Sequence, residues 1–242
     1  MLMLRILFIV IGCCLFHQAT AQNRINPSRI DIVRDSFGVP HIFAKTDPEV
    51  AYGLAWAHAE DDFESIQDVV LPAKNLMGRV KGKAGAAGDY AFQLFRCNEI
   101  TEERWHTLSP QFIQLAEAYV QALNDFAKKY PGRVLHKKIF PVTVKEYIAS
   151  SVLALTVFNG VEGMLGSIYN NRVNTIPQLA DKGSNAAAVH ASRSASGENL
   201  LMVNAHQPNT GSQAFYEAHV CSEEGWNALG GLLAGGPCIL HG

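Results

Sequence analysis

The sequence predicts an α+β protein in which a mostly helical segment precedes a segment of short strands. Three observations support this prediction. Residues 29–44 have the pattern of a β-hairpin, two capping boxes begin apolar stretches, and two short apolar runs joined by a turn-rich segment follow residue 183. The helix-rich and strand-rich parts therefore follow one another along the chain.

The first expected elements are a hairpin and a long helix. Ile32 and Ile42 flank the turn residues 35–38, which is the arrangement of two short strands around a tight turn. Thr46 and Glu49 then have capping-box spacing, so a helix is expected to begin there and to continue through AYGLAWAHAEDDFESIQDVV.

Two further helices are expected. Ser109-Pro110 is a helix start, and apolar residues recur after it at three- and four-residue steps until Pro131-Gly132. These residues are Phe112, Leu115, Ala116, Tyr119, Leu123 and Phe126. Thr143 and Glu146 form a second capping box, and the helix that it opens is expected to fade around residues 159–160.

The pattern changes after residue 165. Residues 166–183 are polar and lack a period, so they are expected to be a linker. Residues 186–190 and 200–203 are two apolar runs joined by SRSASGEN, which predicts a hairpin, and further strands are expected at 214–220 and 237–240. Because a sheet that begins in this way needs more strands, the chain is expected to be truncated.

Composition excludes several classes of protein. The chain has 242 residues, of which 48% are hydrophobic and 17% charged, with a formal net charge of −2. These values are typical of a globular protein with one large or two small domains. No strong charge field favours nucleic acid or an anionic membrane as a partner.

The N-terminus has the features of a secretory signal peptide over residues 1–21. Arg5 precedes the apolar run 6–11, and Ala19-Thr20-Ala21 provides a small-x-small cleavage site before Gln22. Export to the periplasm or the medium is therefore expected. One alternative is a buried N-terminal helix, and another is a lipoprotein box that leaves Cys13 lipidated.

Cysteine spacing and two polar segments give no support for a metal or nucleotide site. Beyond the leader, Cys97, Cys221 and Cys238 are an odd number and match no zinc pattern, so one is free or has a partner elsewhere. His58, Glu60, Asp61 and Asp62 are expected to form a solvated helix face with buried structural pairs. The glycine-rich segment 78–88 lacks the Gly-Lys-Ser/Thr ending of a phosphate loop.

Several motifs together resemble one family. The segment RDSFGVPHIFAKTDPEVAYGLAWAHAEDDF is similar to the start of penicillin acylase α-chains, and residues 183–185, 204–206, 215–219 and 235–237 resemble the start of the β-chain in the same order. His206 stands where penicillin G enzymes have Gln, which is similar to the branch that acts on acyl-homoserine lactones, aculeacin-type lipopeptides and cephalosporins.

The resemblance implies an N-terminal nucleophile hydrolase with an αββα sandwich, here incomplete. Residues 22–165 would be the mostly helical α-chain part, residues 166–183 a spacer propeptide, and residues 184–242 the start of the β-chain part. The precursor would cut itself between Gly183 and Ser184, and the two chains would remain associated. The flexibility of Gly183 would help the backbone to reach the strained geometry of that cut.

The resemblance also implies roles for individual residues. Ser184 would be the nucleophile and its freed α-amino group, with an unperturbed pKa of roughly 7.7–8.0, the base. His206 would orient the hydroxyl or the amine, although a strand-end histidine is the alternative reading. Phe158 would line the acyl pocket or belong to the core. Asn204, judged as a residue by itself, is expected to cap a turn rather than to touch substrate.

The expected substrate is a small-molecule N-acyl amide, such as an acyl-homoserine lactone or a β-lactam, without nucleic-acid or membrane partners. No cofactor is expected; some relatives bind structural calcium, for which Glu162 is the nearest candidate. The oxyanion-hole residues of relatives would lie beyond Gly242, so this segment alone is expected to be a poor catalyst. Two alternatives remain open: a secreted binding module and a family member that has lost its activity.

Overall fold

The computed structural model describes residues 24–161, 164, 167–168 and 183–242. The helices are α2 (Asp47–Val70), α3 (Met77–Lys81), α4 (Lys83–Leu94), α5 (Cys97–Arg104), α6 (Pro110–Lys129) and α7 (Val144–Phe158). Short 3-10 turns lie at Pro27–Arg29, Pro72–Lys74, Trp105–Thr107, Pro131–Arg133 and Ala191–Arg193. The strands are β1 (Asp31–Arg34), β2 (Pro40–Ala44), β3 (Ser184–Val189), β4 (Leu200–Ala205), β5 (Phe215–Ser222) and β6 (Asn227–Leu233). The expected mixture of helices and strands is confirmed.

The predicted starts of the long helices are correct. Both capping boxes are formed: Thr46 with Glu49 opens α2, and Thr143 with Glu146 opens α7. The Ser109 hydroxyl accepts a hydrogen bond from the Phe112 amide at the start of α6. These side chains stabilise the helix starts because they satisfy backbone amides that have no partner within the helix.

The long helix α2 contains a break that its sequence does not announce. Asp62 has φ −141° and ψ 66°, values far from the helical region. Its carboxylate accepts a hydrogen bond from the Ser65 amide at 3.1 Å, which is the contact of a helix N-cap. Asp62 therefore ends one helical segment and begins the next.

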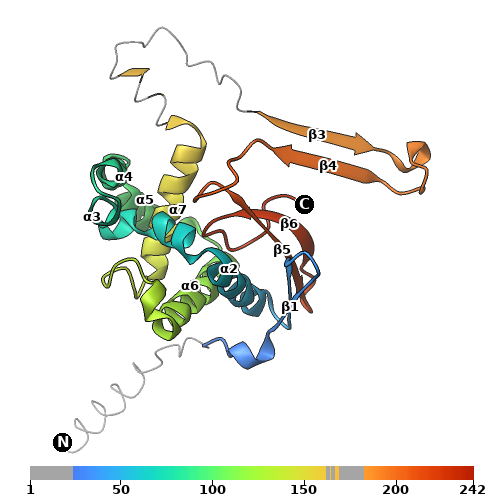
Figure 1. Ribbon diagram of the computed structural model, residues 1–242, viewed down its shortest axis with the longest axis horizontal. Coiled ribbons are helices and arrows are strands. Elements are labelled where there is room, and N and C mark those ends of the chain that lie inside the picture. The colour runs from blue at the N-terminus through green and yellow to red at the C-terminus, as the bar shows by residue number, and fades with distance from the viewer. Residues whose placement is uncertain (1–23, 162–163, 165–166, 169–182) are drawn as a thin grey trace, which may run out of the picture.

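The strands form two separate sheets. One has the order β1-β2-β5-β6, in which β2 and β5 are parallel and the other neighbours are antiparallel; the other consists of β3 and β4 alone. The β1–β2 and β3–β4 hairpins and strand β5 were predicted correctly. In Figure 1 the β3–β4 hairpin projects away from the helices and from the four-stranded sheet.

One predicted strand is wrong. Residues 237–240 form no strand, and His241 only makes an isolated bridge to Gly231. The strand that follows β5 along the chain is β6, whose sequence NALGGLL has two central glycines and so lacks the usual composition of a strand. Glycine is needed at both positions, because a Cβ on Gly230 would collide with the backbone of His241 and Gly242, and one on Gly231 would meet the Phe215 ring.

Helix α2 joins two parts of the core. One face packs against α6 and α7 through residues such as Phe63, Tyr119 and Phe126. The other face covers the four-stranded sheet, where Leu54 lies among Ile42 and Val220. The glycine-rich segment 78–88 belongs to α3 and α4, and the site of a Cβ on Gly85 is occupied by the Met77 backbone. Its glycines therefore allow close helix packing.

Candidate active site

Ser184 is the first residue of β3, and its backbone pairs with Ala205 at the end of β4. The serine is exposed, and Gly183 before it is exposed as well. No atom of the described residues lies within 4 Å of the position that a Cβ on Gly183 would take. Both residues of the predicted scission bond are therefore exposed, and the side-chain position of Gly183 is free of steric contact.

His206 follows β4 directly and contacts the residue next to the serine. Its Nε2 atom lies 3.1 Å from Nδ2 of Asn185. Within the described residues no hydrogen bond joins His206 to Ser184. From the sequence, Asn185 was only a member of the Gly-Ser-Asn motif, and no role was predicted for it.

The remaining predicted site residues are not gathered around Ser184. Phe158 is the last residue of α7, and 46% of its surface is exposed. Asn204 lies within β4 opposite Asn185 and not in a turn, which corrects the capping expectation. Glu162, the leader and residues 166 and 169–182 of the linker lie outside the described residues.

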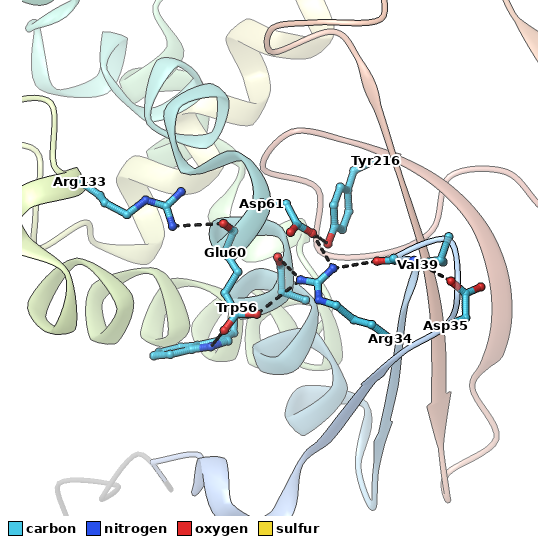
Figure 2. A network of polar contacts seen from close by, with 10 residues as sticks. Arg34, Asp35, Val39, Trp56, Glu60, Asp61, Arg133 and Tyr216 are labelled. Carbon is cyan, nitrogen blue, oxygen red and sulfur yellow. Dashed lines mark hydrogen bonds and ion pairs between the residues drawn. The ribbon is translucent and has the colours of Figure 1, made fainter.

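A polar network connects the first hairpin, α2 and β5 (Figure 2). Arg34 donates to the Asp61 carboxylate at 2.8 Å and approaches Glu60 at 3.4 Å. The Tyr216 hydroxyl donates to the same Asp61 oxygen at 2.6 Å. Glu60 also accepts from the Trp56 ring nitrogen, at 2.9 Å. Glu60 and Asp61 thus have structural partners, as predicted, but these ion pairs are partly exposed rather than buried, and His58 is buried rather than on the solvated face.

His58 is buried beside this network. Its ring stacks on the Tyr216 ring with centroids 4.0 Å apart and planes at 4°. Burial lowers the pKa of His58 to about 4, against a smaller opposite effect of Asp62 and Asp61. The Nδ1 atom of His58 has no hydrogen-bond partner among the described residues. The neutral imidazole therefore acts as an aromatic packing group between α2 and β5.

A second contact between distant segments lies on the outer face of the sheet. His41 on β2 and His219 on β5 are register partners, and their Nδ1 atoms are 3.1 Å apart. Nε2 of His219 lies 2.9 Å from the Asn227 side-chain oxygen, which fixes that nitrogen as a donor. In its neutral form His219 then accepts at Nδ1 and His41 donates to it.

The thiols, metal-ligating groups and helices add three observations. Cys97, Cys221 and Cys238 are free, and burial raises the pKa of Cys97 to about 11. In the described ranges no group of three or more His, Cys, Asp or Glu residues is arranged to hold a metal ion. None of the helices described is long and apolar enough to cross a membrane.

Comparison with known proteins gives consistent results. The penicillin amidase family model matches residues 29–242. The acyl-homoserine lactone acylase PvdQ of Pseudomonas savastanoi pv. phaseolicola is 26% identical over 88% of this chain and 32% of its own length. PvdQ of Pseudomonas fluorescens strain Pf0-1 is 25% identical over 86% of this chain and 31% of its own length. The chain thus spans about a third of these relatives.

More distant matches carry the penicillin G acylase name. The enzyme of Escherichia coli is 23% identical over 63% of this chain and 18% of its own length. A solved structure of the thermostable penicillin G acylase from Alcaligenes faecalis is 19% identical, with a TM-score of 0.42 over 60% of this chain and 84% of that chain. The family match extends from the first hairpin through Ser184 to residue 242 and covers most of the sequence. This chain therefore belongs to the penicillin amidase family.

Proposed function

We propose that this chain is part of an amide hydrolase that cleaves the linear amide bond of N-acyl compounds, with Ser184 as its N-terminal nucleophile. The observation that carries the proposal is the position of Ser184 at the open start of β3, within the segment that matches the family and beside the Asn185–His206 contact. Named acyl-homoserine lactone and penicillin G acylases among the relatives support the same reaction class.

The first step is self-cleavage. The Ser184 hydroxyl attacks the carbonyl carbon of Gly183, the peptide nitrogen leaves as the α-amino group of Ser184, and an ester joins the two segments. Water then hydrolyses the ester, which returns the hydroxyl and leaves Gly183 with a free carboxylate. The exposure of both residues gives water access to this bond.

In the processed protein one residue supplies both the nucleophile and the base. The α-amino group has an unperturbed pKa of roughly 7.7–8.0, so a substantial part is neutral near pH 7.5 and can accept the hydroxyl proton. The hydroxyl oxygen attacks the substrate carbonyl to form an acyl-enzyme, and the amine product leaves with a proton. Water then releases the acid. A separate Ser-His-Asp set is not needed.

The proposed substrates have an apolar acyl group and a polar amine part, with acyl-homoserine lactones ranked above penicillin G. Burial of the acyl chain contributes about 0.8 kcal/mol per methylene, so kcat/KM should rise steeply with chain length until the pocket is full. Phe158 is a candidate wall residue, because its ring is half exposed at the end of α7. Export is proposed with the same function, with a mature N-terminus at Gln22.

Scission is tested first, by intact mass of the complete protein. We expect two chains with a break at Gly183-Ser184, one unbroken chain for Ser184→Ala, and at least partial cutting for Ser184→Cys, because a thiol can perform the same acyl shift. Ser196→Ala, in the same hairpin, is the matched control and should be cut normally. Two chains from Ser184→Ala would assign the cut to another protease and remove the nucleophile proposal.

Activity is tested next. The processed protein is offered acyl-homoserine lactones of increasing chain length and penicillin G, and release of the free amine is measured. If Ser184 is N-terminal and no acyl amide is hydrolysed, the enzyme proposal fails. The protein would then be a family member that has kept the fold and lost the activity. Sequencing of the exported product should begin at Gln22; a lipid-modified Cys13 would instead place the protein on a membrane anchor.

A further inference from the structure

The register of the β3–β4 hairpin separates the serine hydroxyl from His206. Ser184 pairs with Ala205, and Asn185 pairs with Asn204. Successive side chains of a strand point to opposite faces. Asn185, Asn204 and His206 therefore share one face, and the Ser184 side chain lies on the other. The backbone nitrogen of Ser184, which is the future amine, belongs to the strand backbone between the two faces and is one residue before Asn185.

The contact of Asn185 with His206 defines a protonation state. Nδ2 of a carboxamide only donates hydrogen bonds, so Nε2 of His206, 3.1 Å away, must accept. An imidazole that accepts at Nε2 is neutral and carries its proton on Nδ1. The asparagine thus selects one tautomer of the histidine and fixes the orientation of the ring.

We propose that Asn185 is a positioning residue, which holds His206 neutral and in its Nδ1–H tautomer beside the Ser184 amine. This inference rests on the proposed function. The amine must take a proton from the hydroxyl, and a positive imidazolium nearby would oppose that proton by like-charge repulsion. A neutral, oriented imidazole avoids this repulsion and offers one N–H donor.

Asn204 provides a control that the hairpin itself supplies. It is the same residue type, lies on the same face and is the direct cross-strand partner of Asn185. The hydrogen bond to His206 nevertheless comes from Asn185, one residue after the serine. If only a polar side chain on this face were needed, replacing either asparagine by alanine would have the same effect on His206.

The first experiment reads the tautomer without any need for catalysis. Histidine-labelled Ser184→Ala protein, complete and uncut, is examined by ¹⁵N NMR at a pH where the ring is neutral. We expect His206 as the Nδ1–H form. Asn185→Ala should shift it toward Nε2–H, and Asn185→Asp should place a proton on Nε2, because a carboxylate can only accept. Asn204→Ala should leave the spectrum unchanged. An unchanged spectrum for Asn185→Ala, or an equal change for Asn204→Ala, would overturn the inference.

The second experiment uses the processed protein and the acyl amide that it hydrolyses fastest. We expect Asn185→Ala to lower kcat on the order of ten- to a hundredfold with little change in KM, which is part of the roughly 10²–10⁴-fold that positioned acid–base groups contribute. A normal kcat in Asn185→Ala would refute the positioning role of Asn185 and leave the proposed function intact. Absence of scission or of hydrolysis in the unsubstituted protein would refute the proposed function, and the NMR result would still decide the tautomer.

Discussion

The body around α2 and the β3–β4 hairpin have similarly apolar sequences but opposite environments. Leu54 on α2 is fully buried, whereas Leu201 and Met202 on β4 are 65% and 55% exposed. The body around α2 therefore contains the apolar contacts that stabilise the fold. The β3–β4 hairpin contains the residues proposed to act in scission and hydrolysis. Substitutions should divide in the same way: those in the body should change the free energy of unfolding, and those near Ser184 should change reactivity.

The largest effect is expected in the core of the body. Phe126 is fully buried and its ring packs against those of Phe63 and Trp56. Phe126→Ala should lower the free energy of unfolding by about 3–5 kcal/mol, because it removes apolar contacts and leaves a cavity. Met202→Ala should cost less than about 0.5 kcal/mol. Urea unfolding of both variants measures the difference, and equal losses would contradict the distinction between the two regions.

A pH effect of somewhat smaller size is expected from His58. Its folded pKa of about 4 lies below the unfolded value of about 6.5, so between these values the unfolded chain binds more protons. The free energy of unfolding should therefore fall as the pH is lowered through this window, by up to about 1.4 kcal/mol per pH unit from this group.

His58→Gln should flatten the part of the curve that His58 causes, when stability is measured by urea unfolding from pH 7 to pH 4. His106→Gln replaces an exposed histidine and should leave the slope unchanged. The same slope in wild type and His58→Gln would assign the pH dependence to other groups.

The fit between α2 and the sheet can be tested at one glycine. A Cβ on Gly53 would lie 2.7 Å from Cγ2 of Ile42 and 2.8 Å from Cγ2 of Ile30. Gly53→Ala should cost about 1–3 kcal/mol, because overpacking exceeds the gain in helix propensity. A Cβ on Gly132 would have no neighbouring atom within 4 Å among the described residues, so Gly132→Ala serves as the control. Higher melting temperatures for both variants would show that the sheet can move away from α2.

The smallest effect is expected at the polar network between α2 and β5. Tyr216→Phe removes the hydrogen bond to Asp61 but keeps the stacking on His58. Because 41% of the Asp61 side chain is exposed and water can replace the lost donor, the expected cost is about 1 kcal/mol. Tyr90→Phe, on a largely exposed residue, should have no effect on chemical denaturation. A larger loss of stability for Tyr90→Phe than for Tyr216→Phe would contradict a stabilising role of the Tyr216–Asp61 hydrogen bond.

Local signals in the sequence were sufficient for the elements that local contacts determine. The capping boxes at Thr46 and Thr143 place the starts of α2 and α7, because the cap and its partner are only three residues apart. The hairpin ending in Ala205 was predictable from two apolar runs and a polar turn. Strand β6 was missed because its glycines are required by close contacts with Phe215, His241 and Gly242, which its own sequence cannot reveal.

The candidate site divides in the same manner. Gly183, Ser184 and His206 became candidates through the family resemblance, which several short motifs carry in the same order along the chain, and their roles stay predictions. The Asn185 contact could have been inferred from the alternation of side chains once the hairpin was aligned, but not before. The Arg34–Asp61–Tyr216 network joins three segments far apart in the chain, so only the assembled sheet and helix bring it together.

The parallel pairing of β2 with β5 has a consequence for how the chain folds. His41 and His219 are 178 residues apart, and closing a loop of that length costs roughly 5 kcal/mol of chain entropy. The sheet should therefore be completed late, after α2 offers a face on which β5 can dock, and folding should be slow. In a chain cut at the proposed Gly183-Ser184 bond, which lies between these strands, the same step would become an encounter of two molecules. Its rate after denaturation should then depend on protein concentration, whereas that of the uncut chain should not.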